Sequence, residues 1–208
     1  MGSLPFYILS EIAIMKSFLI TLRVAAITLL LTGVLYPLGI TMVAQVFFPE
    51  TANGSLLQDE SGRVVGSRLI GQSFHQSGYF HPRPSAAAYD GLASGGSNLG
   101  TSAALLRQRV TLEIARLRAT NPEASDPLPV ELVTTSASGL DPHLSRAAAR
   151  WQVPRLARAR GISPARVCAA LEESFNGRDL GFLGEPTVNV LELNLMLDRR
   201  FGKANILH

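Results

Sequence analysis

The hydrophobic and polar positions divide the chain into a long apolar segment near its start and a mixed remainder. Residues 24–48 contain no charged side chain. A helix of this length is roughly 37 Å long, which exceeds the roughly 30 Å hydrocarbon thickness of a bilayer. We therefore predict one transmembrane helix within residues 17–48. Pro37, Gly33 and Gly39 are tolerated there, where they kink the helix or let a second helix approach closely.

A cleaved signal peptide is the main alternative to a retained anchor. Its apolar region typically has about 7–15 residues and ends in a small-x-small cleavage site. The apolar run here is longer, and Met42 stands at the −3 position of the best cleavage site, so a retained anchor is favoured. Lys16 and Arg23 precede the charge-free stretch, whereas residues 49–62 contain acidic residues and no Lys or Arg. The positive-inside rule then predicts a cytoplasmic N-terminus and an extracytoplasmic C-terminal part.

These flanks divide the chain into three parts. We assign residues 1–16 to a cytoplasmic N-terminal extension, in which Met15 has the form of a normal start, and residues 17–48 to the transmembrane helix. Residues 49–208 form one extracytoplasmic (periplasmic) domain, for which the patterns below predict an α+β fold.

The first half of this domain shows a hairpin, a loop and a helix. Turn residues between short alternating runs predict a β-hairpin from residues 55–59 and 63–70. Residues 71–100 lack periodicity, and the aromatic side chains among them argue against disorder. An apolar stripe then predicts a helix over residues 101–120, with Asn98 or Thr101 as its N-cap. The stripe consists of Leu106, Val110, Ile114 and Leu117.

The second half is mostly helical by its cap signals. A short strand is expected over residues 130–135. Asp141-Pro142 predicts a helix to about Trp151, and Pro154 a further short helix that stops at Gly161. Ser163-Pro164 predicts a helix to about Glu173. Asn189 and Glu192 form a capping box for the last helix.

The last helix has an alternative. Leucines alternate at residues 191–197, which also fits a strand, but Leu, Met and Glu favour the helix.

Composition agrees with one anchor and one domain. The chain has 19 Lys+Arg, 16 Asp+Glu and a net charge of +3, and 32 of the 35 charged side chains follow residue 48. The only cysteine, Cys168, excludes an intrachain disulfide. An excess of three positive charges is weak support for nucleic-acid binding.

No catalytic or metal-ligand pattern stands out. The four histidines have no i, i+4 pair and no cysteine partners for zinc, and no Walker loop or nucleophile elbow occurs. Residues 153–173 resemble a helix-turn-helix, which indicates either DNA binding or two packed helices joined by a tight glycine turn. The predicted extracytoplasmic position favours the packed pair, and no nucleic-acid partner is expected.

The segment Ser94–Gly95–Gly96–Ser97–Asn98 is the other candidate for chemistry. Glycines and hydroxyls leave backbone N–H groups available for an anion or a partner loop. The simpler interpretation is a tight turn before the following helix. The neighbouring aromatic-bearing loop keeps a protein contact open as a third interpretation.

Several sequence blocks occur in an order that resembles a known family, the C subunit (KdpC family) of the Kdp-type potassium-transporting P-type ATPase. The resemblance covers residues 15–201. It rests on GVLYPLGITMVAQVFFPETANGSL (33–56), GSRLIGQSF (66–74), YFHPRPSAAAYDGLASGGSNLG (79–100), SGLDPHLS (138–145), ARARGIS (157–163) and VNVLELNLMLD (188–198).

This resemblance implies an accessory subunit of an ATP-driven, high-affinity potassium import complex in the cell inner membrane. Its partners would be a channel-like A subunit and the ATP-hydrolysing B subunit, besides the lipid bilayer. The family is described as stabilising assembly and as a catalytic chaperone that assists ATP binding by the B subunit. We expect no independent catalysis and no metal. ATP binding is expected only in complex with the B subunit.

The two most specific blocks supply the candidate partner- or nucleotide-contact residues. They are Tyr79, His81, Arg83, Ser94, Gly95, Gly96, Ser97 and Asn98. ATP is cytoplasmic, whereas the flanking charges place these residues outside, so direct ATP contact conflicts with the predicted topology. Two further hypotheses stay open: an anchored extracytoplasmic enzyme or binding protein, and an anchored regulator that uses the Arg-rich helix pair.

Overall fold

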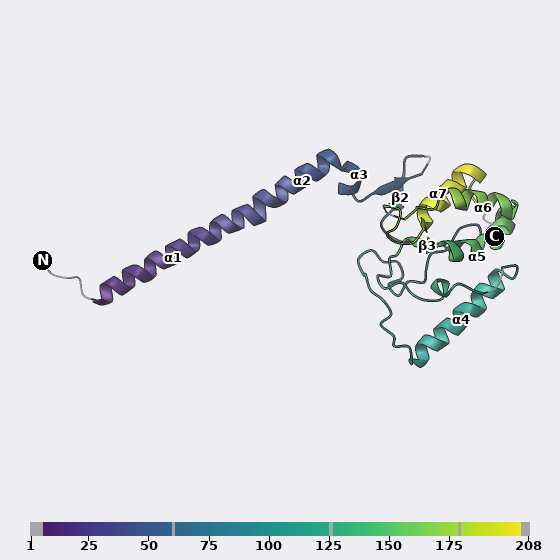
Figure 1. The fold of residues 1–208 in the computed structure, drawn as a ribbon, viewed down its shortest axis with the longest axis horizontal. Helices are drawn as coiled ribbons and strands as arrows, with labels where there is room; N and C mark the ends of the chain where they lie inside the picture. The colour runs from purple at the N-terminus through teal and green to yellow at the C-terminus, as the bar shows by residue number, and fades with distance from the viewer. Residues whose placement is uncertain (1–5, 60, 125–126, 179, 205–208) are drawn as a thin grey trace. The chain divides into compact units, whose positions relative to one another are not determined.

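The computed structural model describes residues 6–59, 61–124, 127–178 and 180–204 (Figure 1). The chain divides into two compact units, Met1–Gly54 and Ser55–His208. Each unit is described by itself.

The first unit is a helical rod. Helix α1 (Phe6–Leu30) continues through a π-helical turn, η1 (Leu31–Leu35), into α2 (Tyr36–Phe47), and the short helix α3 (Pro49–Ala52) follows. Among the described residues, Ile14–Phe47 is the one helical stretch long and apolar enough to cross a membrane, and its side chains are exposed. This finding agrees with the single apolar helix expected near the N-terminus.

The π-helical turn stands directly before Pro37. Proline has no N–H to donate, and its ring collides with the carbonyl four residues earlier, which belongs to Gly33. A wider turn over Leu31–Leu35 relieves this collision without ending the helix. A Cβ added at Gly33 or Gly39 would meet nothing within 4 Å, so both positions are open to a neighbouring helix.

The second unit begins with the expected hairpin. Strands β1 (Leu56–Gln58) and β2 (Val64–Ser67) are antiparallel, with an irregularity between Leu57 and Gln58. Asp59 organises the turn, because its Oδ1 accepts the N–H groups of Ser61 and Arg63. A hydrogen bond from the Ser61 hydroxyl contributes most to lowering the pKa of Asp59, to about 2.

The core of this unit lies among three helices and a second small sheet. Helices α5 (Arg146–Arg160), α6 (Pro164–Glu173) and α7 (Val190–Phe201) pack around the antiparallel pair β3 (His143–Ser145) and β4 (Thr187–Asn189). The larger core side chains include Phe80, Leu144, Leu156, Val167, Leu171, Leu193 and Leu197. The second unit is therefore α+β with small sheets, as the sequence predicts.

Besides the predicted break at Pro154, three sequence-based predictions in this unit are wrong. Residues 130–135 contain a 3-10 turn, η2 (Val130–Leu132), in place of a strand, because no neighbouring strand offers these residues an edge. The helix predicted to start after Asp141-Pro142 begins later, since residues 143–145 first pair with β4. Ser145 is its N-cap. The helix α4 (Ala104–Thr120) starts after Ala103 without a side-chain cap, so neither Asn98 nor Thr101 caps it.

Pro154 does not divide α5 as predicted. An interior proline costs a helix about 3 kcal/mol. Here the helix continues because the residues around the proline are buried, among them Val153 and Leu156. Gly161 ends the helix as predicted, in a left-handed conformation with a φ of 65°.

The predicted helix-turn-helix segment is a packed pair. Val167 on α6 is fully buried, and Arg166 stacks on the Phe201 ring of α7. The two acidic residues that end α6, Glu172 and Glu173, pair with arginines of α5 and α7. The exposed end of α6 is therefore acidic and already paired, which supports the interpretation of two packed helices.

Candidate functional site

The first candidate block is an extended segment held by two buried amide side chains. Asn194 of α7 accepts the Phe80 N–H at 2.8 Å through Oδ1, and its Nδ2 donates to the Phe80 carbonyl at 3.0 Å. Gln152 of α5 does the same for His81, accepting its N–H at 2.9 Å and donating to its carbonyl at 2.9 Å. Each amide thus takes the place of a neighbouring strand for one residue.

Tyr79 is tied to the helices rather than to solvent. Its hydroxyl donates to Asp198 Oδ2 at 2.9 Å. Arg160 pairs with the other oxygen of Asp198 at 2.8 Å and lies 5.0 Å from the centre of the Tyr79 ring. Burial contributes most to raising the pKa of Tyr79, and the hydrogen bond to Asp198 adds to it. Tyr79 therefore serves as an anchor between α5 and α7.

His81 lies against a buried cation. Its Nε2 is 3.0 Å from the Gln76 carbonyl and 3.4 Å from Arg155 Nη1. Burial and the Arg155 charge lower the pKa of His81 to about 4, so the ring is neutral near pH 7. Arg155 is itself only 4% exposed, and it donates to the Ser77 carbonyl and to Gln152. Burial lowers its pKa to about 10.

Arg83 turns toward residues 134–142. Its Nη1 is 3.2 Å from Asp141 Oδ2, and its Nη2 is 3.5 Å from the Thr135 carbonyl. The Tyr89 hydroxyl donates to the Arg83 carbonyl at 2.6 Å. The hydrogen bond from His143 contributes most to lowering the pKa of Asp141, and the Arg83 charge adds to it. Arg83 therefore stabilises the loop structurally, through a half-buried ion pair.

The second candidate block packs against the same segment. The Gly95 N–H donates to the Ser138 carbonyl at 2.8 Å, and the Ser94 hydroxyl donates to the same oxygen at 3.1 Å. Thr135 and Ser97 hydroxyls are 3.4 Å apart. A Cβ at Gly96 would lie 3.0 Å from the Ala137 carbonyl oxygen. Gly96 thus permits a close approach of two loops, and the Gly95 N–H already has a hydrogen-bond acceptor.

The structure therefore divides seven of the eight candidate residues between two places. Arg83 and residues 94–97 meet at the segment 134–142, whereas Tyr79 and His81 are fixed to α5 and α7. Asn98, which has a φ of 51°, is exposed. Sequence reasoning missed the clamp formed by Asn194 and Gln152. Its signal in the sequence was an amide among the apolar residues of α7, and in α5 an amide three residues before Arg155.

A small cavity of about 440 Å³ lies beside Tyr79 and Asp198. At its edge the Ser73 hydroxyl and His75 Nε2 are 2.7 Å apart, a pair that the sequence analysis also missed. Hydrolytic catalysis by such a pair needs a third group that orients the histidine. In the described part of the chain no carboxylate pairs with the His75 ring, and no cluster of three metal-ligating side chains occurs.

An apolar helix long enough to span a bilayer and a small α+β unit, whose candidate residues mostly bond within that unit, are compatible with a single-pass membrane protein. A family model described as "K+-transporting ATPase, c chain" matches residues 18–199, and the chain belongs to this family.

Curated relatives agree over nearly the whole length. The Potassium-transporting ATPase KdpC subunit of Myxococcus xanthus is 59% identical over 189 residues, which cover 90% of each chain. The protein of the same name from Rhodospirillum rubrum is 52% identical over 183 residues, covering 87% of this chain and 94% of the relative. That from Methylibium petroleiphilum is 56% identical over 174 residues, covering 82% and 91%.

Proposed function

We propose that this chain is a non-catalytic accessory subunit that stabilises an ATP-driven, high-affinity potassium import complex. The observation that carries the proposal is the family match over residues 18–199, which includes both the apolar helix and the α+β unit. The internally bound candidate residues support it, because a partner-contact domain needs a stable surface and no converging catalytic groups.

We further propose that the chain is a single-pass protein of the inner membrane with a cytoplasmic N-terminus. Support comes from Lys16 and Arg23 before the charge-free stretch and the acidic residues after it. In this topology the α+β unit is periplasmic and docks on the extracytoplasmic face of the channel-like A subunit, near the potassium entrance.

The proposed role in ATP binding is indirect. A periplasmic loop cannot touch cytoplasmic ATP, and the Gly95 N–H that a phosphate would need already donates to Ser138. The chain would act as a catalytic chaperone of the ATP-hydrolysing B subunit by holding the complex in a state that binds ATP well. Residues 94–97 then belong to the packing of the domain.

Co-purification tests the main proposal. From potassium-starved cells in mild detergent, the tagged full chain should bring down a P-type ATPase subunit and a channel-like subunit in constant proportion. A chain that purifies alone under these conditions, while the other two subunits stay together without it, would overturn the proposal.

Cysteine labelling tests the topology. With Cys168 replaced by Ser, a cysteine introduced at Ser94 should react with a membrane-impermeant maleimide in intact spheroplasts, whereas one at Ser10, in the predicted cytoplasmic extension, should react only after permeabilisation. The reverse pattern, or crosslinks from Tyr79 or Ser94 to cytoplasmic domains of the B subunit, would contradict the periplasmic placement.

A further inference from the structure

Helix α4 carries a second apolar stripe on the face turned away from the domain. Its inner stripe, Leu106 to Leu117, is buried or half-buried. On the opposite side every residue of a 3-4-3-4 repeat is exposed and uncharged. We call this repeat the outer stripe; it consists of Leu105, Gln108, Leu112, Ala115 and Ala119. Figure 1 shows α4 along the edge of the α+β unit, where the Thr120 carbonyl at the end of α4 accepts a hydrogen bond from Arg158 of α5.

The spacing of the outer stripe is that of a helix-helix seam. Positions separated alternately by three and four residues lie on one side of a helix and pack against a second helix. Leu105 and Leu112 are 62% and 64% exposed, so each presents a large apolar surface to solvent. Ala115 and Ala119 continue the seam with small side chains, which allow two helix backbones to approach closely.

Arginines border the stripe on both sides. Arg109 and Arg116 lie along one side of the outer stripe, and Arg118 lies along the other. Helix α4 has four arginines against one glutamate, a net charge of +3. Arg116 is held by Glu113, with Nε to Oε2 at 2.9 Å, so part of this charge is already paired. The outer stripe of α4 thus has an apolar centre and a basic border. A partner helix that complements it would carry apolar residues along the contact and acidic residues beside them.

We propose that the outer stripe of α4 docks an acidic-bordered helix of another subunit of the transport complex; this inference rests on the proposed function. A second copy of this chain does not fit, because in either orientation the bordering arginines would face arginines. A bilayer surface fits less well, because interfacial helices use bulky Trp, Phe and Leu, whereas this stripe has two leucines and no aromatic side chain.

Site-specific photocrosslinking tests the occupant. A photoreactive phenylalanine analogue at position 112 of the full chain, expressed with the other subunits in native membranes, should crosslink to one partner subunit. The matched control is position 69, where the native leucine is 57% exposed. Crosslinking at position 112 only to lipid or to a second copy, equal crosslinking at both positions, or none at position 112, would overturn the proposal.

A substitution tests the contribution of the seam. Leu112→Glu places a charge in an exposed position, so the domain keeps its fold, as the unchanged fluorescence of buried Trp151 should show. The variant should co-purify with the partner subunits about 10-fold less well than wild type, which is about 1.4 kcal/mol. Leu69→Glu should co-purify normally.

The outcomes separate this inference from the proposed function. If wild type and Leu112→Glu both co-purify fully, the outer stripe is not a docking surface and the proposed function stands. If wild type itself does not co-purify, the proposed function and the inference fall together.

Discussion

At the residue scale, two amide side chains decide the path of the candidate loop. Asn194 and Gln152 are each 2% exposed, and each satisfies both backbone groups of one loop residue. A buried backbone group without a partner costs about 1–3 kcal/mol. The loop segment therefore keeps its extended form although no strand lies beside it.

Replacing Asn194 by leucine should expose this dependence. The Phe80 N–H and carbonyl would stay buried without partners, so the free energy of unfolding should fall by about 2 to 4 kcal/mol. Trp151, the only tryptophan and only 6% exposed, reports the transition by fluorescence during denaturant unfolding of the solubilised full chain. The control Gln108→Ala changes an exposed amide and should alter stability by less than about 0.5 kcal/mol.

His81 makes stability depend on pH. Its pKa is about 4 when folded and 6.5 when unfolded, so between these values the unfolded chain binds more protons. Stability should be full above pH 6.5 and should fall as the pH drops toward 4, by roughly 2 to 3 kcal/mol. His81→Asn should flatten the pH dependence of the free energy of unfolding between about pH 4.5 and 6.5. An unchanged slope would assign the loss to other groups.

At the element scale, cap signals predicted helices well where a cap and a buried stripe coincide. Asn189 accepts the Glu192 N–H and starts α7, and Pro164 starts α6. The same kind of signal failed at Asp141, whose Oδ1 accepts the His143 N–H to form a turn. Residues 143–145 then pair with β4, and pairing across 40 or so residues of chain leaves no local trace in the sequence.

Two glycines at the loop contact should respond differently to alanine. Gly139 has a φ of 71°, and an added Cβ would lie 2.8 Å from the Gly95 carbonyl oxygen. Gly139→Ala should therefore lower the free energy of unfolding by about 2 kcal/mol. Gly95→Ala meets nothing within 4 Å and should be nearly neutral in unfolding.

Gly95→Ala also tests the role of residues 94–98. Gly95→Ala should also leave the ATP concentration for half-maximal hydrolysis by the purified complex unchanged. A several-fold increase with Gly95→Ala, without loss of stability, would favour direct nucleotide contact by this loop.

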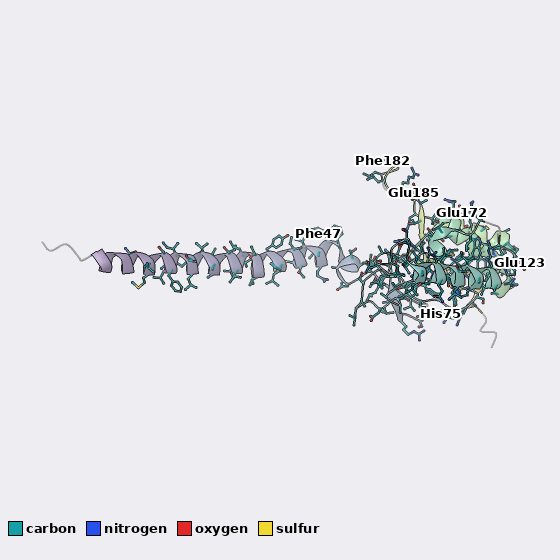
Figure 2. The ribbon with its side chains drawn as sticks, turned by 90° about the horizontal axis from the view of Figure 1, so that it is seen from below. Phe47, His75, Glu123, Glu172, Phe182 and Glu185 are labelled. Atoms are coloured by element: carbon teal, nitrogen blue, oxygen red, sulfur yellow. The ribbon has the colours of Figure 1, made fainter. Side chains whose placement is uncertain are left out.

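At the scale of the whole molecule, the charge distribution and the two units correspond. The apolar rod ends at Phe47, and the polar α+β unit begins at Ser55. Figure 2 shows the side chains of the rod arrayed around its axis. In the second unit, Phe182 projects away from the other residues and is 69% exposed. Such surfaces are expected on a chain that works with partners and a bilayer.

Removal of residues 1–14 should leave the protein functional. The family match starts at residue 18, and a chain that starts at Met15 keeps Lys16 and Arg23. We expect unchanged membrane insertion, co-purification and potassium-limited growth. The control, a chain that starts after Arg23, lacks both topology signals and should insert in mixed orientations. Loss of function on removing residues 1–14 alone, or N-terminal sequencing that finds Gly2 in the native protein, would show that the extension is used.

The apolar helix, the α+β class, most helix positions and the family resemblance can be read from the amino-acid sequence alone. Each rests on a local or cumulative pattern: the length of the uncharged stretch, the 3.6-residue periodicity, the helix caps and the order of the sequence blocks. The clamp on Phe80 and His81, the pairing of β3 with β4, and the outward position of the second stripe of α4 became visible in the folded protein. Those depend on contacts between residues far apart in the chain, and on which of two apolar helix faces the core covers.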